Sequence, residues 1–173
     1  MASDPLTLTL TSTSPTLGPP LYLPHPISRL SMRVRDVHAL FHGTAPVPPF
    51  SPVRSTFVDV RDVADCVVAA VEQHCGPSRV RPLRKERYLL VGNEEPVSPR
   101  GIADVLSERF PERRDRIPVG GGTAEEEAEI LNGWRFDAGK ARERLLGGRR
   151  WVGFEQSVAE SAEAFVRLEG GSN

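Results

Sequence analysis

The chain has 173 residues, which is enough for one domain with a real hydrophobic core but hardly enough for two. Its 22 Lys and Arg residues balance 23 Asp and Glu residues, so the net charge of −1 gives no electrostatic reason to expect a nucleic acid or an anionic membrane as partner. The 16 prolines and 15 glycines indicate a globular chain that is rich in loops.

The sequence shows no targeting or redox signature. The longest aliphatic run, Cys66–Val71, is far shorter than the roughly 20 residues that cross a bilayer. Met1–Asp4 has neither the basic nor the apolar part of a secretory signal. Two cysteines, Cys66 and Cys75, cannot form a disulfide framework or a zinc site by themselves. We therefore expect a cytoplasmic protein.

The first third of the chain predicts one strand and one helix, joined by loops. Leu6–Thr11 alternates leucine with threonine, which is typical of a strand with one solvated face. Ser31–His42 predicts a helix that Gly43 ends. Thr44–Ser55 carries four prolines and predicts a loop. The apolar stripe of the helix consists of Val34, Val37, Leu40 and Phe41.

The middle of the chain predicts a short strand, Thr56–Val60, and a helix that Asp62 caps and that runs to about Gln73. Asp65 adds a carboxylate to the first turn, where it suits the helix dipole. Cys66 on this helix is interpreted as a packing residue. The residues expected to face the core are Val63, Val67, Ala70 and Val71.

Arg87–Val91 predicts the second full strand, and Ser98 caps the helix that follows it. Pro99 suits the first helical position, and Phe110 with Pro111 ends the helix. The apolar face of this helix consists of Ile102, Val105 and Leu106.

The C-terminal part predicts two helices after a flexible segment. Gly120–Glu129 joins a triple glycine to clustered glutamates, and we expect it to be mobile. Asp137 caps a short helix that Gly147 and Gly148 end. The last helix, Glu155–Leu168, carries Val158, Ala162, Phe165 and Leu168 on one face.

Strands alternate with helices, which predicts an α/β fold with parallel pairing. We expect Leu6–Thr11 and Arg87–Val91 to lie side by side and parallel, joined by a right-handed crossover. These are the only full strands that the sequence predicts, whereas a sheet usually has about five or six. We expect residues 6–168 to fold and the ends at 1–5 and 169–173 to be disordered. Because only two full strands are predicted in the folded region, we expect its sheet to be partial.

Three patterns have the outline of a functional site but lack a required part. His38 and His42 are spaced to bring two imidazoles to one metal ion, yet no third ligand stands near them in the sequence. Gly120–Gly122 leads into glutamates that would repel a phosphate. Arg79–Arg87 is basic but has no interleaved aromatic residue for base stacking. We interpret the histidines as ordinary side chains, the glycines as a hinge and the basic run as a solvated insertion.

A series of short segments nevertheless follows a specific order: Gly18–Leu21, Leu40–Gly43, Phe57–Ala64, Arg87–Gly92, Ile102–Leu106, Phe110–Pro111, Arg116–Pro118, Phe136–Lys140 and Leu145–Gly147, with a helix after Phe154. In this order the chain resembles an extended short-chain dehydrogenase/reductase. The most similar branch is the dihydroflavonol-reductase-like group, which belongs with the NAD-dependent epimerase/dehydratases. The resemblance covers about residues 6–168 and implies a Rossmann-like NAD(P)-binding fold.

The resemblance concerns only the C-terminal half of that family. A full member starts with a strand and a Gly-x-x-Gly-x-x-Gly turn that seats the cofactor pyrophosphate, and it carries a Tyr-x-x-x-Lys pair for proton transfer. Here Tyr22 is followed four residues later by Pro26, and Tyr88 by Gly92, so neither forms that pair. The N-terminal Rossmann strands, the cofactor turn and the catalytic tyrosine are thus missing from this sequence, and we predict no catalytic residue.

What remains of the site is one border of the cofactor pocket. By resemblance, the loop after the first strand lies beside the nicotinamide, and a polar residue at the start of the next helix approaches the cofactor phosphates. An arginine suits a phosphate physically. The resemblance thus implies NAD or NADP as cofactor and a small carbonyl substrate. The residues it places at the pocket are Ser14, Pro15, Gly18, Pro19, Ser31 and Arg33.

Three hypotheses stay open. The chain is the substrate-side part of an NAD(P)-dependent oxidoreductase, of ketone or aldehyde reductase or epimerase/dehydratase type, that does not catalyse by itself. Alternatively, it is a non-catalytic interaction module that docks on a partner supplying the rest of the sheet. Third, the sequence is a piece of an ordinary reductase. For the isolated chain, the unpaired edge of the strand Leu6–Thr11 predicts self-association. We expect neither nucleic acid nor membrane as a partner.

Overall fold

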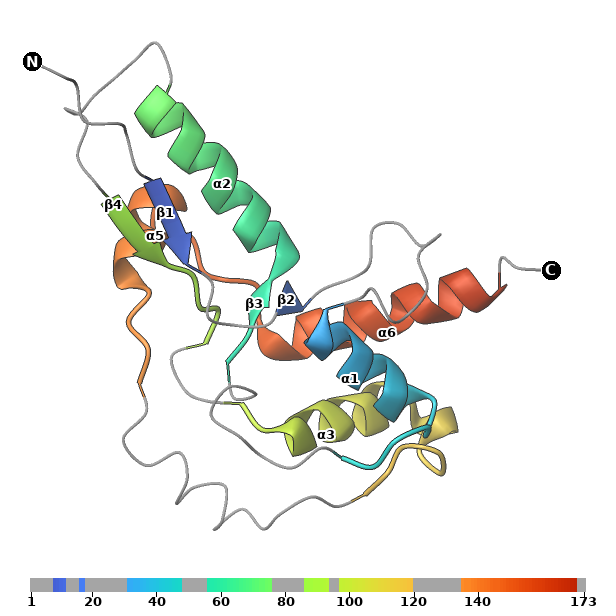
Figure 1. Ribbon diagram of the computed structural model, residues 1–173. Helices are drawn as coiled ribbons and strands as arrows, with labels where there is room; N and C mark the ends of the chain where they lie inside the picture. Colours follow the sequence, from blue (N-terminus) through green and yellow to red (C-terminus); the bar gives the residue numbers. More distant parts are fainter. Residues whose placement is uncertain are drawn as a thin grey trace, which may run out of the picture.

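The computed structural model describes residues 8–11, 16–17, 31–47, 56–75, 86–93, 97–119 and 135–170 (Figure 1). The strands are short: β1 (Leu8–Thr11), β2 (Thr16–Leu17), β3 (Val58–Asp59) and β4 (Glu86–Leu89). The helices are α1 (Met32–Phe41), α2 (Val60–Cys75), α3 (Pro99–Arg109), the 3-10 turn η3 (Pro111–Arg113), α5 (Gly139–Leu145) and α6 (Phe154–Gly170). Within these ranges, no helix combines the length and the apolar character of a membrane span.

The strands form two parallel pairs. β1 pairs with β4, with Leu8 opposite Glu86 and Thr11 opposite Leu89. β2 pairs with β3 in the same way. The predicted parallel pairing of the first strand with the one near residue 88 is thus confirmed. Parallel neighbours require a long crossover, and here the chain between β1 and β4 includes α1 and α2.

The larger core lies among the helices α1, α3 and α6, which pack against one another in one corner of the molecule (Figure 1). The predicted apolar faces of these helices are confirmed, except that Leu168 near the end of α6 is 37% exposed. The buried residues at the centre of this core include Val37, Leu40, Phe41, Ile102, Leu106, Val158, Ala162 and Phe165.

A smaller core joins α2, β4 and α5. Cys66 and Ala70 of α2 are fully buried there, against Tyr88 and Leu90 from β4 and the residue after it. The prediction that Val67 and Val71 face the core is wrong, because they are 41% and 50% exposed. α2 carries apolar residues on several of its faces, so local periodicity does not decide which stripe packs against the core. The stripe through Cys66 and Ala70 packs there, and Val67 and Val71 face outward.

Two serine side chains cap helices: Ser98, as predicted, and Ser31, for which only the start of the helix was predicted. The Ser31 hydroxyl accepts the Val34 N–H at 3.4 Å at the start of α1, and the Ser98 hydroxyl accepts the Gly101 N–H at 3.0 Å at the start of α3. Each removes one unpaired donor from the helix start. Gly43 follows α1 with φ 63°, and a Cβ there would collide with the Arg116 carbonyl.

Two predicted caps differ in detail. Asp62 is not an N-cap, because α2 already begins at Val60 and Asp62 lies inside its first turn. Asp137 does accept the Gly139 N–H at 2.8 Å, but the cap position itself belongs to Ala138. Gly147 and Gly148 end α5 in the left-handed region, at φ 61° and 81°. The predicted mobile segment Gly120–Glu129, residues 1–5 and residues 171–173 lie outside the described residues. The prediction of a disordered tail from residue 169 is wrong at its start, because Glu169 and Gly170 form the end of α6.

Candidate functional site

The predicted pocket residues are described only in part. Ser14, Pro15, Gly18 and Pro19 lie outside the described residues. They flank β2 in the sequence, and β2 contacts α1, at whose start the other two predicted residues lie: Ser31 is the N-cap and Arg33 is in the first turn. Ser31 and Arg33 therefore lie at the start of the helix that contacts β2, and β2 is the strand that the predicted loop residues flank in the sequence.

Ser31 and Arg33 differ in exposure. Ser31 is partly buried, and its hydroxyl caps α1. Arg33 is 1% exposed, one of the largest buried side chains among the described residues. A guanidinium loses much hydration energy on burial, and in a low dielectric its attraction for an anion or a hydrogen-bond acceptor is stronger than in water.

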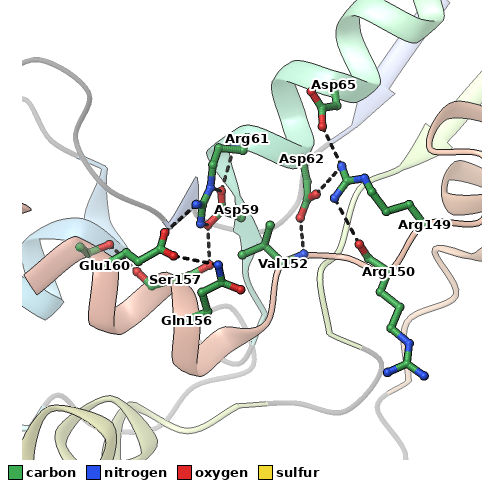
Figure 2. Close-up of polar contacts among 11 residues, drawn as sticks. Asp59, Arg61, Asp62, Asp65, Arg149, Arg150, Val152, Gln156, Ser157 and Glu160 are labelled. Atoms are coloured by element: carbon green, nitrogen blue, oxygen red, sulfur yellow. Dashed lines mark hydrogen bonds and ion pairs between the residues drawn. The ribbon is translucent and has the colours of Figure 1, made fainter. Parts of the chain in front are cut away.

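Among the described residues, a polar cluster centres on Asp59, where β3 runs into α2 (Figure 2). Asp59 is fully buried and accepts hydrogen bonds from the Arg61 backbone N–H at 2.9 Å and from Arg61 Nε and Nη2 at 2.8 and 2.9 Å. The Ser157 hydroxyl of α6 donates to Asp59 at 2.5 Å. Arg61 Nη1 also lies 2.6 Å from Glu160 Oε2. The cluster therefore fastens the β3–α2 junction to the first turns of α6.

The protonation states follow from these contacts. Burial alone would raise the pKa of Asp59, but hydrogen bonds from Arg61 and Ser157 outweigh it and hold that pKa below its usual range. Asp59 in turn raises the pKa of Arg61 further above its ordinary value. Both groups are thus charged at neutral pH, and Asp59 has no proton to donate.

A second buried carboxylate, Asp62, lies one turn further along α2 (Figure 2). It accepts the Val152 backbone N–H at 2.8 Å and lies 3.0 Å from Arg149 Nη2. The same nitrogen is 2.7 Å from the exposed Asp65. Burial raises the pKa of Asp62, although the Val152 N–H and Arg149 act against this. Asp62 therefore ties α2 to the segment that leads into α6, which is a structural role.

These partners were out of reach of local sequence reasoning. Asp59 and Ser157 are 98 residues apart, and Asp62 and Val152 are 90 residues apart. The single local signal is the alternation of acid and arginine in Asp59–Asp62, which predicts the Asp59–Arg61 pair and nothing further.

Cys66 is fully buried, and burial raises the pKa of its thiol to about 11, which agrees with a packing role.

The histidine pair gains a third group in the folded chain. His38 and His42 lie with ring centroids 4.3 Å apart on α1, and His42 Nε2 lies 2.7 Å from Glu169 Oε1 on α6. The sequence offered no third ligand near these histidines because Glu169 is more than a hundred residues away. Folding brings it there by packing α6 against α1.

Comparison with known proteins gives structural matches alone. No protein-family model and no curated protein matches the chain. Among solved structures, the reductase Gre2 from Candida albicans in complex with NADPH matches with 23% identity and a TM-score of 0.63, over 92% of this chain and 43% of that one. Yeast methylglyoxal/isovaleraldehyde reductase Gre2 complexed with NADPH matches with 20% identity and a TM-score of 0.63, over 93% of this chain and 47% of that one.

A sugar-nucleotide enzyme shares the same fold. The UDP-glucuronic acid 4-epimerase from Bacillus cereus, in complex with NAD, matches with 16% identity and a TM-score of 0.59, over 93% of this chain and 45% of that one. The chain thus spans less than half the length of the structures it matches. Its fold is therefore that of a part of the Rossmann-type NAD(P)-binding reductases and epimerases, as the resemblance implies.

Proposed function

We propose that the chain forms the substrate-side part of an NAD(P)-dependent oxidoreductase, of the ketone or aldehyde reductase or epimerase/dehydratase type, and is not catalytic by itself. The observation that carries this proposal is the fold shared with a reductase that binds NADPH, over 92% of this chain and 43% of that one. The C-terminal position of this part rests on the order of the sequence segments described above.

The chemistry of hydride transfer supports the second half of the proposal. Reduction of a carbonyl needs a bound cofactor and a donor that protonates the developing alkoxide, a contribution of about 10²–10⁴ in rate. The 173 residues contain no Tyr-x-x-x-Lys pair and no Gly-x-x-Gly-x-x-Gly turn. The two buried carboxylates of the described residues, Asp59 and Asp62, are held in ion pairs that hold the fold together.

The remaining residues can border a cofactor. A helix N-terminus offers amides and a positive dipole end to a phosphate, and α1 starts at the predicted site. Arg33 in its first turn would add a planar cation, and Ser31 a hydroxyl. Ser14, Pro15, Gly18 and Pro19 would line the nicotinamide side. These contacts reach one phosphate at most, so we expect them to bind NAD(P) weakly without a glycine turn.

One observation favours the second function, an interaction module. Val67, Val68 and Val71 expose an apolar stripe along the outer side of α2, between 41% and 56% exposed. In the described residues β1 pairs with β4 alone, which leaves its other edge open. A partner that supplied further parallel strands would use both surfaces. This partner would be a cofactor-binding half-fold, whether it belongs to the same longer protein or to another chain.

The test is a titration of NADPH into the purified chain, followed by cofactor fluorescence. Arg33→Ala removes the predicted phosphate ligand, and Arg35→Ala on the exposed side of α1 is the matched control. We expect no saturation in the micromolar range for any of the three proteins. Micromolar binding that Arg33→Ala abolishes and Arg35→Ala spares would contradict the proposal, because it would reveal a complete cofactor site.

A further inference from the structure

Three side chains of types that can ligate a metal ion meet where α1 and α6 end. His38 and His42 each offer an imidazole nitrogen and Glu169 a carboxylate oxygen, and these ligand atoms all lie within 4.8 Å of one another. We propose that His38, His42 and Glu169 bind a divalent transition-metal ion, for which Zn²⁺ is the best-suited candidate. The residues of this site come from two helices that are far apart in the sequence.

The set of donor atoms selects the type of ion. Two imidazole nitrogens and one carboxylate oxygen suit Zn²⁺ and its neighbours in the first transition row, whereas Mg²⁺ and Ca²⁺ take oxygen ligands. Three protein ligands also leave a fourth tetrahedral position for water or another small ligand. A histidine pair spaced i, i+4 presents both rings on one helix face, so α1 alone supplies two of the ligands.

The geometry is close to what a zinc ion requires. Bonds of about 2.1 Å place tetrahedral ligand atoms about 3.4 Å apart. His42 Nε2 and Glu169 Oε1 are now 2.7 Å apart, so they would separate slightly around an ion, and the wider separations would shrink. The side chains of His42 and Glu169 are 22% and 45% exposed, which leaves them room for these adjustments.

The surroundings hold the ligands in place. The Phe165 and His38 rings pack edge to face with their centroids 4.9 Å apart, and the centroids of the buried Phe41 ring and the His42 ring are 5.3 Å apart. Arg113, stacked on Phe41, is the neighbouring cation: its Nη2 lies 3.9 Å from Glu169 Oε2. It faces the second carboxylate oxygen and leaves Oε1 turned toward His42.

The helix ends add a favourable field. His38 lies in the last turn of α1, His42 is its C-cap, and Glu169 is the penultimate residue of α6. The unpaired carbonyls at a helix C-terminus carry partial negative charge, which favours a cation. The site lies at the opposite end of α1 from Ser31 and Arg33, so the proposal does not depend on the proposed function.

The experiment is a Zn²⁺ titration of the full chain, freed of metal with a chelator and followed by calorimetry. We expect one ion per chain with a dissociation constant in the micromolar range or below, and a rise in melting temperature with Zn²⁺. Glu169→Gln and His42→Gln should weaken binding by at least about tenfold. The matched controls are His25→Gln and His74→Gln, the two histidines outside the cluster, and both should bind as the unmodified chain does.

Two results would overturn the proposal. One is the absence of saturable binding at micromolar Zn²⁺. The other is equal affinity in Glu169→Gln, His42→Gln and the control variants, which would place the ion elsewhere. Glu169 is exposed at a helix end, so Glu169→Gln should fold normally, and circular dichroism checks this. The result therefore does not depend on His38, whose contact with Phe165 makes its substitution a risk to folding.

Discussion

Replacing Asp59 by asparagine tests the account of the polar cluster at the β3–α2 junction. The amide keeps the shape of the carboxylate but presents an NH₂ group to the guanidinium of Arg61 and cannot accept all four hydrogen bonds that Asp59 receives. Removing one partner of a buried ion pair costs about 3–5 kcal/mol. The side chain of Arg61 is 36% exposed and keeps Glu160, so water offsets part of this cost. We expect a loss of about 2–3 kcal/mol in the free energy of unfolding.

The assay is urea unfolding followed by circular dichroism. With a slope of about 2 kcal/mol per molar urea, this loss lowers the unfolding midpoint by about 1 M or more. Asp104→Asn is the matched control, because Asp104 is 70% exposed and lies 3.8 Å from Arg100 within one helix. That substitution should change stability by less than about 0.5 kcal/mol. Equal midpoint shifts for Asp59→Asn and Asp104→Asn would show that the buried ion pair does not stabilise the junction.

Asp59, Cys66 and the exposed valines of α2 each lead to a testable outcome. The pKa of Asp59 is lower in the folded chain than in the unfolded one, so the stability that its ionised form contributes is present at neutral pH. This stability is lost as the pH falls below about 4 and through the folded pKa. Between pH 7 and pH 3, the unfolding midpoint should therefore fall less steeply in Asp59→Asn than in the unmodified chain. In a Cys75→Ser variant, the remaining thiol of Cys66, with its pKa raised to about 11, should react with a thiol reagent at pH 8 only on unfolding, and fast labelling of the folded chain would contradict its burial. The chain should self-associate at micromolar concentration in light scattering, and a Val68→Ser, Val71→Ser double variant should associate less at unchanged stability, whereas a monomeric unmodified chain would show that these surfaces are covered.

Local signals in the sequence predict the features that local physics decides. Ser98 caps its helix as predicted, because an N-cap needs only a hydroxyl and the next three residues. The parallel pairing of β1 with β4 follows from the alternation of strands and helices. In each case the information lies within one segment or in the order of segments.

Features that depend on tertiary contacts were missed. Asp62 looks like a cap, but its partners Arg149 and Val152 arrive from the other end of the chain. Val67 has the periodicity of a core residue, yet it faces outward because α2 is apolar on more than one side. Glu169 completes the histidine pair only once α6 packs on α1. Of the predicted cofactor residues, Ser31 is the N-cap of α1 and Arg33 lies in its first turn, and their role stays a prediction.

The proposed function implies that this chain carries no complete reductase site. The most direct measurement is NADPH consumption, followed by absorbance, with purified chain and a panel of small aldehydes and ketones. We predict no turnover above the rate without protein, because neither Tyr22 nor Tyr88 is followed by the lysine that proton transfer needs. Steady turnover of many equivalents of NADPH that disappears in Tyr88→Phe or Tyr22→Phe would contradict this account.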